Sequence, residues 1–172
     1  MAVLGNSAFR TDEEITRVYN KFVDTVYRVC FMMLKNADET EDAVQNVFIK
    51  YINCGSAFES DENVKAWLIV VAKNECKNML KHWFRSKRTD IDSVVEPSYE
   101  DSHDDGSLME KVMSLEEKYR VPLYLHYYEG YSAAEIADML KINYSSLRTN
   151  LAKARKKLKL MLEEDEYETE RA

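Results

Sequence analysis

Residues 132–159 constrain the fold more than any other stretch, because they predict two helices separated only by a short turn. Ser132 followed three residues later by Glu135 is a capping box, which marks the start of a helix. A turn is expected at residues 141–143, with Asn143 as the N-cap of a second helix. Two short helices joined in this way form the helix-turn-helix pattern.

The second of these helices is predicted to have one apolar and one polar face. The apolar positions recur at helical spacing: Leu147, Leu151, Ala154 and Leu158. The other face is small, polar or cationic: Ser145, Thr149, Ala152, Lys153 and Lys156, with Arg148 on the flank. Between Lys141 and Lys159 there are seven Lys or Arg residues and no acid. This pattern favours a helix that reads DNA, because phosphate contacts dominate affinity. The alternative is an ordinary solvated amphipathic helix.

Composition favours a mostly helical protein. The chain has 172 residues, with only four Gly and two Pro, and is long enough for one domain or two small ones. Its net charge of −7 argues against a protein that coats nucleic acid nonspecifically. Acidic residues gather at 96–105 and in the tail 163–172, which we expect to be a frayed, solvated terminus. Neither a membrane span nor a signal peptide is evident, so we expect a cytoplasmic protein.

The cysteines and histidines predict no metal site, disulfide framework or cofactor. The three cysteines are widely spaced, and no Cys-x-x-Cys motif or Cys/His cluster occurs: Cys30, Cys54 and Cys76. The three histidines are scattered: His82, His103 and His126. No Gly-rich phosphate loop or nucleophile elbow is present either, so no catalytic residue is expected.

Two amphipathic helices are predicted in the first fifty residues. The first covers residues 12–35, with Thr11 and Glu14 as a capping box. The second begins with Asp38 as cap and Glu41 as its partner. It should bury one set of residues: Ala43, Val44, Val47, Phe48, Tyr51 and Ile52. It should expose another: Glu41, Asp42, Gln45, Asn46, Ile49 and Lys50.

A third helix should run from residues 60–62 to about Arg85. Its core face is apolar: Val64, Trp67, Leu68, Val71, Cys76, Met79, Leu80 and Trp83. Four cations spaced four residues apart are expected on the opposite face, with two amides beside them: Lys73, Lys77, Lys81 and Arg85, with Asn74 and Asn78. Such a row suits a nucleic-acid backbone. The alternative is a solvated face.

The predicted fold is all-α, with two small helical domains at residues 10–88 and 107–162. Between them, residues 89–106 contain acids, Ser, Pro and Gly with little periodicity, which indicates a flexible acidic linker. In the second domain a short helix begins near Leu108. The next helix should cover residues 117–129, started or kinked by Pro122 and ended by Gly130 in the left-handed conformation.

Three motifs in this order resemble bacterial RNA polymerase sigma factors of the extracytoplasmic-function (ECF) group. They read ETEDAVQNVFIKYI (39–52), WLIVVAKNECKNML (67–80) and YRVPLYLHYYEGYSAAEIADML (119–140), and the last precedes a basic helix. The resemblance covers residues 15–160. Two positions depart from it: the turn often carries Gly where this chain has Lys141, and the recognition helix often carries Arg where it has Asn150.

For the first domain the resemblance implies sigma region two, which binds core RNA polymerase and opens the promoter. The polymerase-binding residues would then be on the second helix: Glu41, Asp42, Gln45, Asn46 and Ile49. In the family, a base of the nontemplate strand flips into a pocket made by the loop after this helix. Phe58 would line that pocket, Asn74 would contact a base edge, and three cations would bind phosphates: Lys73, Lys77 and Lys81. Alternatively, Phe58 packs on Trp67 as part of the core.

For the second domain the resemblance implies sigma region four, which reads the minus-thirty-five element in the major groove. Arg148 would bond a guanine bidentately. Other residues would face base edges: Ser145, Ser146, Thr149 and Asn150. A third group would bind phosphates: Lys153, Arg155 and Lys156. The expected partners are core RNA polymerase, promoter DNA as duplex and as melted nontemplate strand, and an anti-sigma factor that controls a stress or signal response. No membrane insertion is expected.

Two other functions stay open on the sequence alone. The first is a free-standing helix-turn-helix regulator that binds duplex DNA as a dimer without polymerase. The second is a helical adaptor with no role on DNA.

Overall fold

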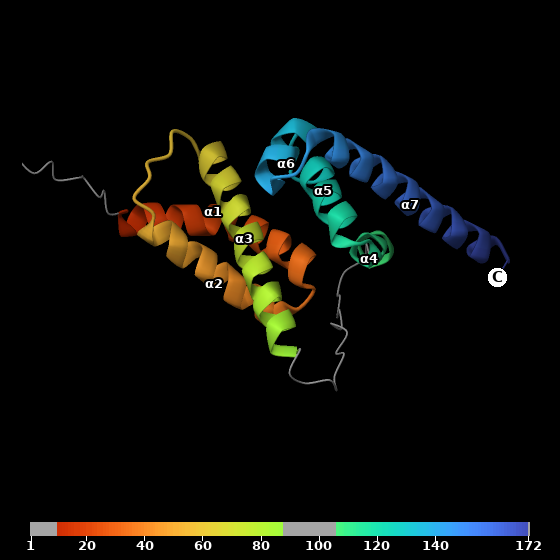
Figure 1. Ribbon diagram of the computed structural model, residues 1–172, viewed down its shortest axis with the longest axis horizontal. Helices are drawn as coiled ribbons and strands as arrows, with labels where there is room; N and C mark the ends of the chain where they lie inside the picture. Colours follow the sequence, from red (N-terminus) through yellow and green to blue (C-terminus); the bar gives the residue numbers. More distant parts are fainter. Residues whose placement is uncertain (1–9, 88–105, 172) are drawn as a thin grey trace, which may run out of the picture. The chain divides into compact units, whose positions relative to one another are not determined.

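The computed structural model describes residues 10–87 and 106–171, and within them the chain forms seven helices and no strand (Figure 1). The helices divide between two compact units, residues 1–96 and 97–172. The first unit contains α1 (Asp12–Leu34), α2 (Ala37–Asn53) and α3 (Asp61–Lys87). The second contains α4 (Gly106–Ser114), α5 (Glu117–Tyr127), α6 (Ala133–Leu140) and α7 (Tyr144–Arg171). The all-α prediction is confirmed, and residues 89–105 of the predicted linker lie outside the described part.

In the first unit each of the three helices packs against the other two. The apolar faces predicted from helical spacing are the ones that meet, with Val18, Val47 and Leu68 almost fully buried. Ile52 is an exception, because it is 43% exposed. It lies in the last turn of α2, where each further turn carries the buried stripe sideways along the helix surface.

The ends of α1 and α2 are fixed by side-chain caps. Thr11 caps α1 as predicted, since its Oγ1 accepts a hydrogen bond from the Glu14 N–H at 3.1 Å. Helix α2 is capped by Asn36 and not by Asp38 as expected; the Asn36 Oδ1 accepts from the Glu39 N–H at 2.9 Å. Asn and Asp are about equally good N-caps, and α2 begins after the one that comes first in the sequence.

The second unit is built around α5 and α7, which enclose one apolar cluster: Leu115, Tyr119, Leu123 and Ala154, with Val112, Leu158 and Met161 packed against it. Helix α5 begins at Glu117 and contains Pro122 in its interior, so the proline does not start the helix. The helix ends at Tyr127, and Gly130 follows with φ +80°, in the left-handed region as predicted.

A buried arginine joins α4 to α5. Arg120 is 4% exposed, and its guanidinium donates to the carbonyl oxygens of Met113, in the last turn of α4, and of Leu115, directly after that helix. These carbonyls have no partner within α4, so the arginine caps the helix from its neighbour. Burial lowers the pKa of the Arg120 guanidinium.

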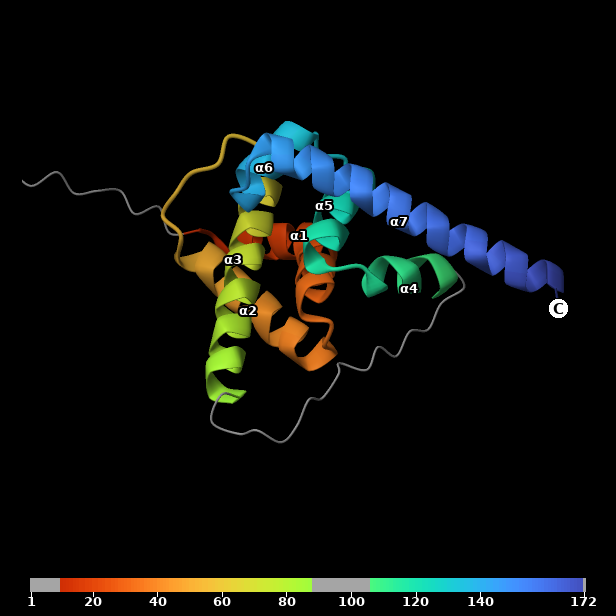
Figure 2. The same ribbon diagram turned by 45° about the vertical axis from the view of Figure 1, so that its right-hand side comes forward.

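Helix α7 continues without a break to Arg171, far past the helix-turn-helix (Figure 2). The expectation of a frayed terminus after Leu162 is therefore wrong. Ion pairs join Lys111 to Asp165 and Lys159 to Glu163, and Glu and Lys are good helix formers. Among residues 10–87 and 106–171, no helix is long and apolar enough to span a bilayer.

Candidate polymerase and nucleic-acid interfaces

The five residues predicted to contact polymerase all lie on the exposed side of α2: Glu41, Asp42, Gln45, Asn46 and Ile49. Ile49 is 53% exposed, an apolar side chain in the middle of a polar face. Asn46 differs from the others, because its Nδ2 donates to the Glu75 Oε1 of α3 at 2.9 Å. This hydrogen bond connects α2 to α3.

Glu75 is a structural residue that the sequence pattern did not single out. It is 9% exposed on α3, and its carboxylate accepts from Asn46 and from Lys50 of α2. A buried carboxylate needs such partners, since an unpaired charge away from water is costly. The signal in the sequence is its position: an acid on the α3 face that also carries Ala72 and Cys76, both fully buried.

The predicted cation row on α3 is only partly present, because Lys73 is buried, with 5% of its surface exposed. A helix turns by about 100° per residue, so residues four apart drift by about 40° at each step. The row therefore winds around α3, and Lys73 lies on the side of the buried Ala72 and Cys76. The prediction that Lys73 binds a phosphate is therefore wrong. The other cations of the row are exposed, as is Asn74: Lys77, Lys81 and Arg85.

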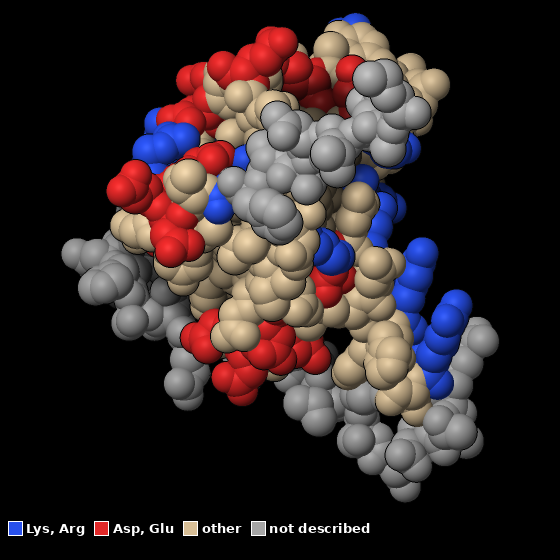
Figure 3. Space-filling view, turned by 90° about the vertical axis from the view of Figure 1, so that its left-hand side faces the viewer, with Lys and Arg blue, Asp and Glu red and all other residues tan. Residues whose placement is uncertain are grey.

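Charge is segregated on the surface. Figure 3 shows Lys and Arg side chains protruding along one edge of the face in view, where few acids lie, whereas elsewhere on this face Asp and Glu gather with other Lys and Arg side chains beside them. A net-negative chain can thus present local surfaces of positive charge.

Phe58 belongs to the loop at residues 54–60, between α2 and α3, and its ring packs inward. Its centroid lies 5.7 Å from that of Trp67 in an edge-to-face arrangement and 6.3 Å from that of Tyr51. Without DNA bound, Phe58 therefore packs on Trp67, which the sequence offered as the alternative to lining a base pocket. It is half-buried, so part of the ring still faces outward.

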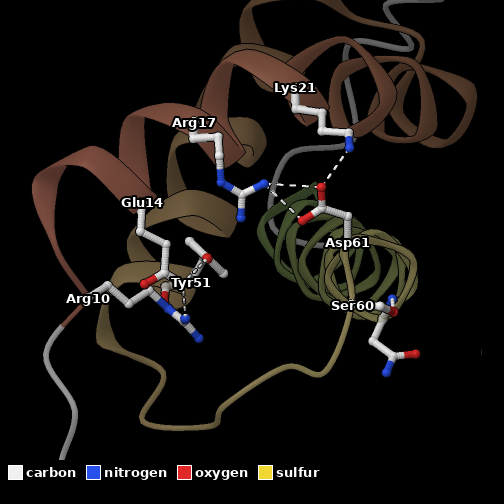
Figure 4. A network of polar contacts seen from close by, with 8 residues as sticks. Arg10, Glu14, Arg17, Lys21, Tyr51, Ser60 and Asp61 are labelled. Carbon is white, nitrogen blue, oxygen red and sulfur yellow. Dashed lines mark hydrogen bonds and ion pairs between the residues drawn. The ribbon is translucent and has the colours of Figure 1, made fainter.

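A polar network that the sequence did not predict connects this loop to α1 (Figure 4). Arg10 donates to the Tyr51 and Ser56 carbonyl oxygens and to Glu14. The Tyr51 hydroxyl is buried and donates to the Glu14 Oε1 at 3.0 Å. Burial, together with this hydrogen bond, raises the pKa of Tyr51 to about 12.

At the far end of the loop, Asp61 pairs with two cations of α1. Its carboxylate accepts from Lys21 at 2.6 Å and from Arg17 at 2.9 and 3.0 Å. The hydrogen bonds from Lys21 and Arg17 lower the pKa of the Asp61 carboxyl. The hydrogen bond to Asp61 in turn raises the pKa of the Arg17 guanidinium.

The helix-turn-helix is formed by α6 and α7 as predicted. Ser132 and Glu135 make a complete capping box, and the Asn143 Oδ1 accepts from the Ser145 N–H at 2.8 Å. Leu147, Leu151 and Ala154 are buried. The turn depends on Lys141, which takes the left-handed conformation with φ 55° and ψ 45°.

Almost every residue predicted to face the minus-thirty-five element is exposed on α7: Ser145, Ser146, Arg148, Thr149, Lys153, Arg155 and Lys156. Asn150 is half-buried. Three of these side chains have partners within the unit, and one of them is Arg148, whose guanidinium carbon lies 5.8 Å from the centroid of the Tyr144 ring. The Thr149 hydroxyl donates to the Ser145 carbonyl at 3.1 Å, and the Arg155 Nη1 donates to the Tyr127 hydroxyl at 3.2 Å.

Comparison with known families gives two matches in the order of the predicted domains. The model described as Sigma-70 region 2 matches residues 18–88, and the model described as Sigma-70, region 4 matches residues 105–158. The chain is 26% identical to the ECF RNA polymerase sigma factor SigX of Bacillus subtilis, over 93% of each chain. It is 28% identical to SigW of the same organism, over 82% of this chain and 84% of SigW.

Solved structures share the fold. The sigma factor RpoE, solved with the anti-sigma factor NepR from Bartonella quintana, matches with a TM-score of 0.71 and 20% identity over 88% of this chain and 98% of RpoE. CnrH, solved with the cytosolic domain of CnrY, matches with a TM-score of 0.64 and 16% identity over 92% and 94%. The motifs, the two family models and the shared fold lead to one conclusion: the chain belongs to the sigma-70 family of RNA polymerase sigma factors, in its ECF group.

Proposed function

We propose that this chain is the promoter-specificity subunit of a bacterial RNA polymerase. Residues 10–88 bind core polymerase and the minus-ten element, and residues 107–162 read the minus-thirty-five element. The observation that carries this proposal is the presence, in one chain, of an exposed polar helix face in the region 2 unit and a cationic recognition helix in the region 4 unit. A free-standing regulator would not need the exposed polar face in the region 2 unit.

The polymerase contact is assigned to four residues of α2: Glu41, Asp42, Gln45 and Ile49. A polar face with an exposed aliphatic residue at its centre is typical of a protein–protein interface. Asn46 takes part indirectly, because its bond to Glu75 fixes α2 against α3.

The minus-ten contact is assigned to the outer side of α3 and to the loop at residues 54–60. Asn74 is exposed and can hydrogen-bond a base edge, while Lys77 and Lys81 bind phosphates. The Phe58 ring packs against Trp67 and is half-buried, and its exposed part is available to a flipped base. Base–aromatic stacking of this kind contributes about 1–3 kcal/mol.

The minus-thirty-five contact is assigned to the start of α7. Arg148 is exposed and suits bidentate bonding to guanine, and the neighbouring Ser146 and Thr149 reach base edges. Lys153 and Lys156 bind phosphates, and Arg155 does so from a side chain oriented by Tyr127. Ser145 and the half-buried Asn150 complete the surface.

Control by an anti-sigma factor is part of the proposal. Two proteins of this fold were solved in complexes, RpoE with an anti-sigma factor and CnrH with the cytosolic domain of CnrY. We therefore expect a signal-responsive sigma factor that acts in the cytoplasm, where its polymerase is. Its part in transcription is selection of the promoter, and bond formation is left to the core enzyme.

The proposal is tested by capture of core RNA polymerase. Wild-type protein should retain the core enzyme, and the variant Asp42→Arg/Gln45→Ala should not, because it reverses a charge and removes an amide on the α2 face. The variant Asp24→Arg/Asn20→Ala makes matched changes at exposed positions of α1 and should bind normally. Failure of the wild type to capture polymerase, with specific binding of duplex DNA by the protein alone, would support the free-standing regulator instead.

A further inference from the structure

The loop at residues 54–60 has no regular secondary structure, yet at its first half it is held by Arg10, which comes from the segment before α1. Arg10 uses all three guanidinium nitrogens: Nε donates to the Tyr51 carbonyl at 2.9 Å, Nη2 to the Ser56 carbonyl at 2.8 Å and Nη1 to Glu14 at 2.7 Å. The first acceptor lies in the last turn of α2, the second belongs to the loop, and the third belongs to α1. The Arg10 side chain is only 6% exposed.

The same guanidinium lies over the aromatic residues beneath the loop. Its carbon is 4.0 Å from the centroid of Tyr51 and 5.1 Å from that of Phe58. A planar guanidinium can stack on rings and donate in its own plane at once, which a lysine ammonium cannot do. Arg10 therefore holds both the backbone of the loop and the ring of Phe58.

The other end of the loop is anchored to the same helix. Ser60 caps α3, since its Oγ accepts from the Asn63 N–H at 3.2 Å. The next residue, Asp61, is paired with Arg17 and Lys21 of α1 (Figure 4). The residues that flank the loop are thus both tied to α1, Tyr51 through Glu14 and Asp61 through Arg17 and Lys21, and Ser56 within the loop is held by Arg10.

We infer that Arg10 is a positioning residue for promoter recognition: it pre-organises the minus-ten loop without itself contacting DNA. The inference rests on the proposed function of that loop. A loop already held in its binding conformation loses less entropy when a base enters. Removing the arginine should therefore weaken recognition of melted DNA specifically and leave binding to polymerase intact, since the contacts described for Arg10 reach α2 only at the buried Tyr51 and not at its exposed face.

The test compares Arg10→Ala with Tyr51→Phe in the full chain bound to core polymerase. Tyr51→Phe removes the hydroxyl that donates to Glu14 but keeps the ring beneath the guanidinium, so it is a control for lost stability alone. The probe is a single-stranded oligonucleotide selected from a random pool with the wild-type holoenzyme. Arg10→Ala should weaken its binding about tenfold, while Tyr51→Phe changes it less than about twofold.

A second measurement is local to the loop. Amide hydrogen exchange at residues 54–60 should become faster in Arg10→Ala and stay near the wild-type rate in Tyr51→Phe. If the alanine variant is unfolded at the assay temperature, Arg10→Lys takes its place, because it keeps the charge beside Glu14 but cannot reach all three acceptors.

Equal effects of the Arg10 and Tyr51 variants on oligonucleotide binding would overturn the inference, since the arginine would then act only through stability. A wild-type protein that does not capture core polymerase would overturn the proposed function, and the inference with it. The two failures are therefore told apart by the wild-type control.

Discussion

Lys141 shows how one residue can carry a local strain. It takes the left-handed conformation at the turn between α6 and α7, at a position where the family often has glycine. This conformation costs a non-glycine residue about 1–2 kcal/mol. The turn forms nevertheless, because the Ser132 capping box and the buried Leu147 fix the helices on either side.

The variant Lys141→Gly should stabilise the second unit by about 0.5–1 kcal/mol, the relief of strain minus the added freedom of glycine in the unfolded chain. The measurement is urea unfolding followed by NMR signals of the α6–α7 turn. Lys141→Ala is the control and should leave stability almost unchanged, because alanine is strained in the same way. A loss of stability in the glycine variant would contradict this account.

The pairing of Asp61 with Lys21 and Arg17 predicts a specific acid dependence. The pKa of Asp61 is lowered in the folded state, so its contribution to stability is present above the ordinary value of 3.8 and is lost as the pH falls through the lower folded value. Asp61→Asn should therefore reduce the melting temperature near neutral pH and flatten its decline in acid.

The check is a series of thermal melts from neutral to acidic pH, at low and at high salt. Because Arg17 and Lys21 are exposed to solvent and Asp61 is only half-buried, salt should shrink the difference between wild type and Asp61→Asn. Parallel pH curves for the two proteins would show that the ion pairs do not contribute.

Among the elements, α7 carries the two kinds of proposed DNA contact, and these should respond differently to mutation. Arg148→Ala should cost about 1–3 kcal/mol at one promoter position and relax specificity there. Lys153→Ala should weaken binding to all sequences alike and reduce the salt slope by about 1. Holoenzyme binding to a minus-thirty-five duplex and its single-base variants, at several salt concentrations, separates the two. Equal behaviour of both variants would argue against this division.

The helices themselves were well predicted, because their signals are local. Thr11, Ser132, Asn143 and Gly130 mark ends that the structure confirms. The errors also have local causes. Spacing of four residues looked like one face on α3, but the drift of the helix buries Lys73.

The contacts that hold the candidate site have no local signal at all. Arg10 lies 41 residues from Tyr51 and 46 residues from Ser56 in the sequence. Neither periodicity nor a motif links such positions, and only the packing of α1 against α2 brings them together. The motifs could therefore predict a role on DNA for this loop, but not what holds the loop in place.

At the scale of the whole molecule, charge distribution sets the conditions for binding. A net charge of −7 repels DNA at long range, while the cations of α3 and α7 attract it locally. The two DNA-binding surfaces proposed for this chain would gain from being linked, since binding of one raises the effective concentration of the other. This division suits a protein that should occupy DNA only when both promoter elements are present.

The length of α7 fixes the distance between the start of this helix and its C-terminal end. The helix has 28 residues, and Ser145 near its start and Arg171 at its end are about 40 Å apart at 1.5 Å per residue. A fluorophore attached at Arg171 would stay clear of the major groove when the start of the helix enters it. Energy transfer from that position to a labelled duplex would then report the angle at which the helix leaves the DNA.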